Sequence, residues 1–273
     1  MRRPSAALIL IISLFMCCSG NRGIIGDATT AYTQGDYKTA YRLYKRLAVQ
    51  GLPVAQYKVG IMYHNGESVP QDNAEAAKWY RKAAEQGYAP AQTNLGMMYE
   101  DGRGIPQDYI EAARWYRKAA DQGDAYAQFA LGFMYYKGRG VPMDNAEAAK
   151  WYRKAAEQGY APAQTNLGMM YEDGRGVPQD YTEAARWYRK AADQGWPTGQ
   201  GLLGALYTFG TGVPKNDVLA HMWISLAIPG LPPTSEIRKS MRKIRKIISL
   251  QMTPAQIAEA QKLAREWKPK KER

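Results

Sequence analysis

The sequence is poor in the residues that most often carry metal sites and covalent chemistry. Its 273 residues include only two cysteines and two histidines. Cys17 and Cys18 both lie near the N-terminus, and His64 and His221 lie in distant parts of the chain without ligands at metal-binding spacing. We therefore expect no metal site, no cofactor and no disulfide framework.

Phenylalanine is also scarce, since four Phe stand beside 20 Tyr and seven Trp. Rings that have one polar end suit half-buried seams between helices better than one deep apolar core. The hydrophobic content of 45% excludes wholesale disorder. The composition therefore favours a thin, folded architecture.

Long apolar runs are limited to the N-terminus. Two arginines, an apolar run over residues 6–18 and two small residues predict a Sec signal peptide over residues 1–20, with a mature chain that starts near Asn21. The apolar run is shorter than the roughly 20 residues that span a bilayer, so a permanent anchor is the weaker alternative. A lipid on Cys17 is a further alternative, which Met16 disfavours. We expect a periplasmic or secreted protein.

Acidic residues are few near the C-terminus. The formal net charge is +12, and from Glu236 onward twelve Lys or Arg stand against four Glu. Such a segment predicts binding to an anionic surface of the cell envelope and not to nucleic acid; the alternative is a solvated helix face. The candidate residues are Arg238, Lys239, Arg242, Lys243, Arg245 and Lys246.

A 36-residue unit occurs five times in the chain. Three residue types keep this interval in every copy. They are Trp79, Trp115, Trp151, Trp187 and Trp223; Gly60, Gly96, Gly132, Gly168 and Gly204; and Tyr63, Tyr99, Tyr135, Tyr171 and Tyr207. Such regularity predicts stacked repeats, because one unit cannot bury its apolar face alone.

Each unit contains two predicted helices. The first, helix A, begins near Pro90 and ends at the glycine-rich turn 101–106, which fits a turn better than a phosphate-binding loop. Helix B begins after Asp108, where Asp108 and Glu111 have the spacing of a reciprocal capping box. A glycine inside helix A predicts a close helix crossing, and the Trp-Tyr pairs of helix B fit seam packing better than ligand stacking.

The unit GYAPAQTNLGMMYEDGRGVPQDYTEAARWYRKAADQ, residues 159–194, resembles a Sel-1-like repeat, a relative of the tetratricopeptide repeat. This resemblance implies an all-α fold, a right-handed α-α superhelix or solenoid of helix-turn-helix repeats, that binds proteins on its concave face. The predicted segments are a short hairpin at 27–50, repeats at 51–86, 87–122, 123–158, 159–194 and 195–228, and a basic helical C-terminal cap at 229–273.

Residues 73–122 and 145–194 are fifty-residue copies that differ at Ile105/Val177 and Ile110/Thr182. The near-identity indicates a recent duplication of a two-repeat block. Residues that the copies share are therefore not marked as functional by recurrence alone.

Helix A positions outside the predicted seam are candidates for contact with a protein or peptide partner. Amides can pair with an extended backbone, and unbranched Met adapts to varied apolar side chains. The alternative is that these side chains are merely exposed. The candidates are Gln92, Asn94, Met97, Gln164, Asn166 and Met169.

We expect a non-enzymatic scaffold or adaptor of the bacterial cell envelope. The main alternative is an enzyme acting on β-lactams or the cell wall, based on the S-x-x-K spacing of Ser240 and Lys243. The companion Lys-Thr-Gly and Ser-Asp-Asn motifs are absent, as are the repeated cysteine pairs of Sel-1-like proteins linked to β-lactams. A secreted host-interaction or virulence factor is a third hypothesis.

Overall fold

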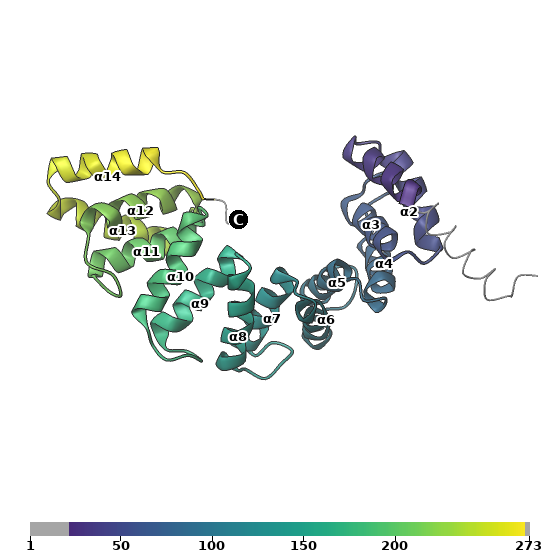
Figure 1. The fold of residues 1–273 in the computed structure, drawn as a ribbon. Helices are drawn as coiled ribbons and strands as arrows, with labels where there is room; N and C mark the ends of the chain where they lie inside the picture. Colours follow the sequence, from purple (N-terminus) through teal and green to yellow (C-terminus); the bar gives the residue numbers. More distant parts are fainter. Residues whose placement is uncertain (1–21, 271–273) are drawn as a thin grey trace, which may run out of the picture. The chain divides into compact units, whose positions relative to one another are not determined.

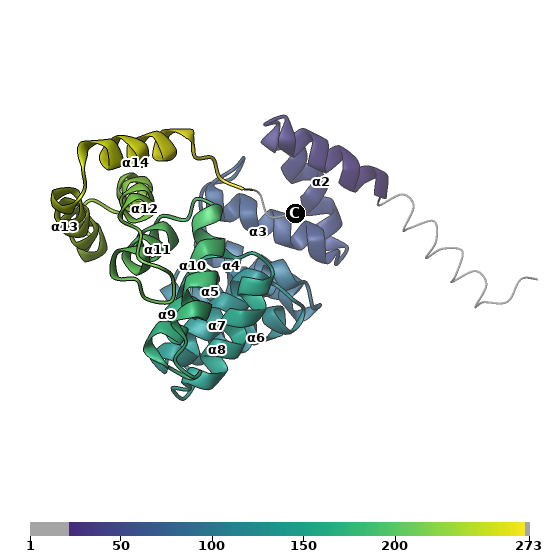
Figure 2. The same cartoon turned by 60° about the vertical axis from the view of Figure 1, so that its left-hand side comes forward.

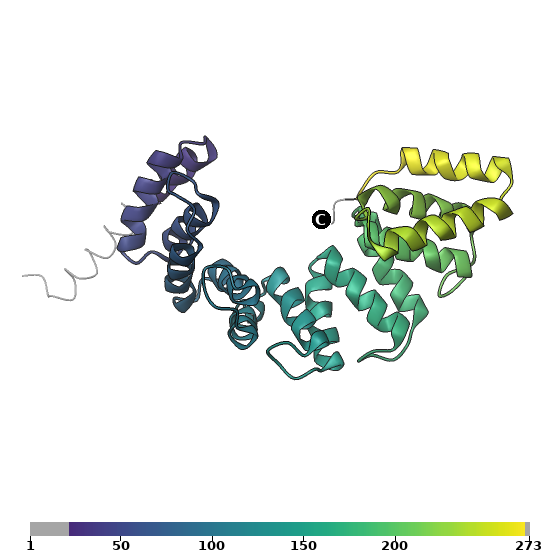
Figure 3. The ribbon, with the colours of Figure 1, turned by 180° about the vertical axis from the view of Figure 1, so that it is seen from behind.

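The computed structural model describes residues 22–270, in which every regular element is a helix. Consecutive helices pack as pairs (Figures 1 and 3). None of the helices in this range has the length and apolarity needed to span a bilayer. The predicted signal peptide lies outside the described residues.

The chain divides into two compact units, with the division between Gln122 and Gly123. The first unit contains a helix over residues 22–33 and then α2 (Tyr37–Val49), α3 (Pro53–Asn65), α4 (Asn73–Glu85), α5 (Ala89–Asp101) and α6 (Tyr109–Asp121). The second contains α7 (Ala125–Lys137), α8 (Asn145–Glu157), α9 (Ala161–Asp173), α10 (Tyr181–Asp193), α11 (Pro197–Phe209), α12 (Asp217–Gly230), α13 (Glu236–Gln251) and α14 (Pro254–Glu266).

The N-terminal hairpin forms around a turn at Gly35 and Asp36. Gly35 adopts φ 80°, and the Asp36 side chain caps α2 by accepting from the Thr39 amide. Ala40 and Tyr44 of α2 are buried. The first helix of this hairpin is longer than expected, because residues 22–26 are helical as well.

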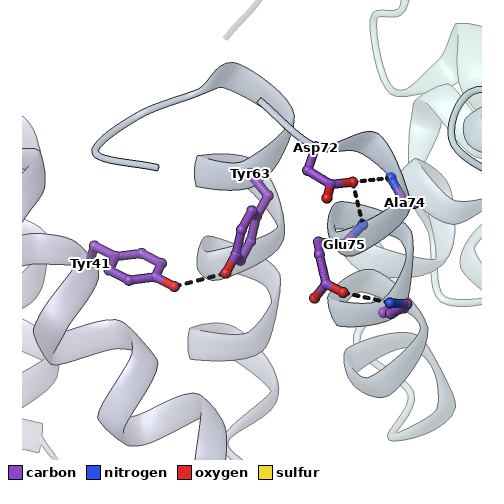
Figure 4. Close-up of polar contacts among 6 residues, drawn as sticks. Tyr41, Tyr63, Asp72, Ala74 and Glu75 are labelled. Atoms are coloured by element: carbon purple, nitrogen blue, oxygen red, sulfur yellow. Dashed lines mark hydrogen bonds and ion pairs between the residues drawn. The ribbon is translucent and has the colours of Figure 1, made fainter. Parts of the chain in front are cut away.

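At the start of helix B, only the aspartate half of the predicted capping box forms. Asp72 accepts from the amides of Ala74 and Glu75, both at 2.9 Å, and so satisfies two free donors at the start of α4 (Figure 4). The Glu75 side chain does not return to the cap and instead pairs with Lys78 at 2.5 Å. The reciprocal capping box expected there is therefore wrong; one does form at Thr253 and Gln256, at the start of α14.

In the first four repeats the recurring glycine of helix A lies against a tyrosine ring of helix B, whereas Gly204 of the fifth lies against Ile224. A β-carbon built on Gly96 would lie 2.8 Å from Tyr116 Cδ1, and one on Gly168 would lie 2.5 Å from Tyr188 Cε1. The close crossing expected from the sequence is confirmed. The tryptophan packs elsewhere, since Trp115 of α6 joins the cluster of buried residues from the preceding pair, α4 and α5.

The C-terminal segment, predicted as a helical cap, forms two helices, α13 and α14. Helix α12 packs against α11, α13 and α14 (Figure 2). Met241 and Ile248 of α13 and Ala260 of α14 are buried in one cluster with Trp223 of α12. These helices therefore cover the last repeat with apolar contacts.

Candidate partner-binding pockets

Two of the predicted partner-binding residues, Gln92 and Gln164, are buried. Gln92 Nε2 donates to the Ala84 carbonyl at 3.0 Å, and Gln92 Oε1 accepts from Gln122 Nε2 at 2.7 Å. Gln164 makes the equivalent contacts with Ala156 and Gln194. The expectation that these amides are free for a partner is wrong, because each one joins its own helix B to the preceding helix B.

The other four candidates lie at two small pockets, one in each unit. The first pocket, of about 160 Å³, contains Asn94 and Met97 of α5. Both side chains are half-buried, so a ligand can contact them without unfolding the seam. The complete lining is His64, Tyr80, Asn94, Met97, Met98, Asp101 and Arg103.

The second pocket, of about 190 Å³, contains Asn166 and Met169 of α9. Met169 is exposed and Asn166 is half-buried. The complete lining is Phe133, Tyr136, Lys137, Tyr152, Asn166, Met169, Met170, Asp173 and Arg175.

The two pockets share one group of side chains at positions that differ by 72 residues. A tyrosine, an asparagine, two methionines, an aspartate and an arginine line both pockets, and all of them belong to the duplicated block. The remaining wall comes from outside the block. It is His64 of α3 in the first pocket, and Phe133, Tyr136 and Lys137 of α7 in the second.

The wall residues outside the duplicated block make different polar contacts in the two pockets. His64 Nδ1 lies 2.9 Å from Asn73 Oδ1 in the first unit. In the second, Arg175 donates to the Tyr136 hydroxyl at 2.6 Å and lies 3.2 Å from Asp173. Lys137 lies over the Tyr136 ring at 4.9 Å. The second pocket is therefore more aromatic and carries an additional cation.

The tyrosine behind each pocket differs from the tyrosine of the next repeat. Burial raises the pKa of Tyr152 well above its usual range, and the nearby Asn166 amide partly offsets this rise. Its hydroxyl is buried and has no hydrogen-bond partner of normal geometry within residues 22–270. The Tyr188 hydroxyl, by contrast, donates to Glu172 at 2.5 Å. The Tyr152 hydroxyl thus has only a weak interaction with the Asn166 amide, in place of the carboxylate bond that Tyr188 makes.

The six predicted anion-binding cations do not form one surface. Lys239, Arg242, Lys243 and Lys246 are exposed on α13. Arg238 is half-buried and donates to the Leu231 carbonyl at 3.1 Å, while Arg245 is half-buried and lines a cavity between α12, α13 and α14. The solvated-face alternative therefore fits the four exposed cations better than it fits Arg238 or Arg245.

The residues proposed for catalysis are not assembled into a site. Ser240 and Lys243 are both exposed on α13, and no hydrogen bond between them is present in the described chain. Neither lines the pockets described above or the cavity beside α13. Across residues 22–270 no cluster of three His, Cys, Asp or Glu side chains could hold a metal ion.

Sequence reasoning missed the walls of the pockets. Tyr80, Tyr152, Asp101 and Arg103 were interpreted only as seam and turn residues. The signal that was available is the short Asp-Gly-Arg spacing after helix A, because it returns both charges to the end of that helix, where they pair at 2.7 Å in the first unit.

This architecture defines a helical repeat protein of paired-helix units with no strands over residues 22–270. The Sel1 repeat model matches residues 53–88, 89–124, 125–160, 161–196 and 197–228. The chain belongs to the Sel1 repeat family. Four of these repeats begin and end two residues later than the sequence suggested, and the fifth also begins two residues later but ends at the expected residue 228.

Two solved structures are similar over most of the chain. One is a protective antigen present in uropathogenic Escherichia coli strains and displaying an SLR fold, with 34% identity and a TM-score of 0.79 over 93% of this chain. This chain spans 56% of that protein's length. The other is a Sel1 repeat protein from Oxalobacter formigenes, with 32% identity and a TM-score of 0.77, covering 89% of this chain and 99% of that one. A comparison with curated protein sequences gave no significant match.

Proposed function

We propose that this protein is a non-enzymatic scaffold or adaptor of the bacterial cell envelope that binds extended segments of protein partners. Sel1 repeat proteins generally mediate protein–protein interaction. The observation that carries the proposal is the pair of equivalent pockets at Asn94 and Asn166, which lie outside the packed seams. The repeated seam residues are already occupied by internal contacts and are poor candidates for specificity.

Each pocket suits one apolar side chain of an extended peptide. Met97 or Met169 provides an adaptable apolar contact, and the neighbouring asparagine offers both a donor and an acceptor to the peptide backbone. The Asp and Arg at the pocket edge add polar contacts at the rim, where interfaces are commonly polar. Lys137 favours an acidic residue beside the apolar one in the second pocket.

Export by the Sec pathway is part of this proposal, and it is supported by the residue pattern of positions 1–20. We expect the mature chain to begin near Asn21 in the periplasm or outside the cell. N-terminal sequencing of the protein recovered from the envelope fraction tests this point. A chain that still starts at Met1 and stays in the cytoplasm would contradict it.

Site-specific photo-crosslinking tests the binding proposal. A photoreactive phenylalanine analogue is placed at position 97 or 169 and, as a matched control, at Met143, an exposed methionine in a turn outside both pockets. We expect the same partner to be crosslinked from positions 97 and 169 and not from position 143. Equal crosslinking from all three positions, or none above background, would contradict a pocket-directed partner.

A further inference from the structure

A third cavity, the α12–α14 pocket, has a different chemistry. It has a volume of about 450 Å³ and lies between the C-terminal helices of the second unit. Its apolar lining is small, and consists of Ile257 and Ala264. The polar side chains come from all three helices: His221 and Ser225 from α12, Arg245 and Ser249 from α13, and Gln261 and Arg265 from α14. Every one of them can donate a hydrogen bond.

The two guanidinium groups of this pocket lack a counter-charge. No carboxylate lies within ion-pair distance of Arg245 or Arg265 in the described part of the chain, although ion pairs form elsewhere on α13, as at Lys239 and Glu236. The Arg245 side chain makes one long contact, 3.5 Å from Nη1 to Ser225 Oγ. Because Arg245 is half-buried and Arg265 is exposed, their remaining donors stay accessible from the pocket and can bind an arriving anion.

The environment of His221 also indicates that the pocket suits an anion. Its side chain is buried, and desolvation together with the Arg245 charge lowers its pKa below the ordinary value of 6.5. The neutral ring lies 3.5 Å from the Ser225 hydroxyl through Nδ1. An arriving anion would offset the positive potential that His221 now experiences, and its resonances would report that event.

The pocket does not resemble a nucleophilic site, despite the neighbouring serine and histidine. In a Ser-His pair a carboxylate or another acceptor orients the base and stabilises its charged form. Here the charged neighbour is the Arg245 guanidinium, which opposes protonation of the ring. The arrangement suits binding of an anion and not removal of a proton from Ser225.

We propose that the α12–α14 pocket binds a small oxyanion, a phosphate or a carboxylate group, with Arg245 as its principal ligand. Guanidinium groups bind such groups through paired, charge-assisted hydrogen bonds. Ser225 and Arg265 provide the additional donors, while the Ser249 hydroxyl donates to the Arg245 carbonyl at 2.8 Å. This site is separate from the two peptide pockets, and it goes beyond the proposed scaffold function.

The two histidines of the chain provide a direct test, because His221 lines this pocket and His64 lies in the other unit. The purified full chain, isotopically labelled at histidine, is titrated with inorganic phosphate and, separately, with acetate. We expect a saturable shift of the His221 resonances while those of His64 stay unchanged. Tighter binding of phosphate or of acetate identifies which oxyanion the site prefers.

Variants on one helix separate the pocket from general basic charge. Arg245→Gln should weaken anion binding at least tenfold, while Arg242→Gln, an exposed cation on α13, should change it less than twofold. Arg245→Lys, which keeps the charge but loses the paired donors, should give intermediate binding and serves if the Gln variant unfolds. Equal weakening by the Arg242 and Arg245 variants, equal shifts of both histidines, or no saturable shift would overturn the proposal.

Discussion

The two copies of the duplicated block, residues 73–122 and 145–194, have almost the same sequence but form pockets with different walls. Each copy provides the same tyrosine, asparagine and methionines. The opposite wall comes from the preceding helix, α3 in one case and α7 in the other, which was not copied. Duplication therefore kept the side chains that we propose contact a peptide and left the neighbouring surface free to differ.

This comparison separates residues that build the repeat from residues that give it specificity. The glycine–tyrosine crossings and the glutamine bonds occur in both copies and hold the stacked helices together. The aromatic side chains Phe133 and Tyr136 occupy the positions equivalent to Ile61 and His64, of which His64 lines the first pocket. We infer that both pockets bind related peptides with different preferences.

The largest expected effect is loss of stability when a helix crossing is overfilled. Gly168→Ala would place a methyl group within 2.5 Å of the Tyr188 ring, and Gly96→Ala would meet Tyr116 in the same way. We expect each to lower the free energy of unfolding by up to about 3 kcal/mol, as overpacked cores do. Denaturant unfolding measures both variants.

The control for these variants is Gly26→Ala. Gly26 lies in a helix, and an added β-carbon would meet nothing within 4 Å. We expect it to leave stability unchanged or raise it by up to about 1 kcal/mol, because Ala favours helix over Gly. The losses of unfolding free energy in Gly96→Ala and Gly168→Ala should agree with each other. A difference between them that is larger than the change caused by Gly26→Ala would mean that the two copies are not packed alike.

A smaller effect distinguishes the two tyrosines within one copy. Tyr188→Phe removes a hydrogen bond to the Glu172 carboxylate and should cost about 1.5 kcal/mol. Tyr152→Phe removes a buried hydroxyl with no partner of normal geometry in the described chain, so it should be neutral or stabilising. Thermal unfolding of the two variants tests this difference. Equal losses would mean that the Tyr152 hydroxyl has a partner after all.

Much of the fold was predictable from the sequence, since Trp, Gly and Tyr at a fixed interval specify the helix pairs and Gly-rich turns specify their ends. The capping acids were found, but the partner of Glu75 was not, because capping and pairing with Lys78 have similar spacing. The buried glutamines were misjudged because Gln92 follows the seam residue Ala91 directly and its hydrogen bonds join residues 8 and 30 positions away.

The candidate site was only partly predictable. Asn94 and Met97 were identified from helix A, but the wall residues His64 and Tyr136 come from another repeat and no local pattern marks them. The division of the basic segment into exposed cations and the pocket residue Arg245 depends on how α13 packs against α12. The sequence alone shows that the segment is basic, but not which of its side chains face solvent and which face the pocket.

The smallest expected effect is a change in peptide preference. Ile61→Phe together with His64→Tyr gives the first pocket the aromatic wall of the second. We expect peptide affinity at the first pocket to shift toward that of the second by about 1 kcal/mol, the usual value of an added aromatic contact. Calorimetric titration of a peptide selected on the second pocket measures the shift. An unchanged preference would mean that the side chains shared by both pockets determine specificity instead.

The most direct test of the central claim is partner affinity in Asn94→Ala, Asn166→Ala and the double variant, measured with the crosslinked partner. If the two equivalent pockets carry binding, each single variant weakens it by a fewfold, and the double variant weakens it more than either, while Met143→Ala leaves it unchanged. Unchanged affinity in the double variant, with the fold intact by circular dichroism, would contradict the account.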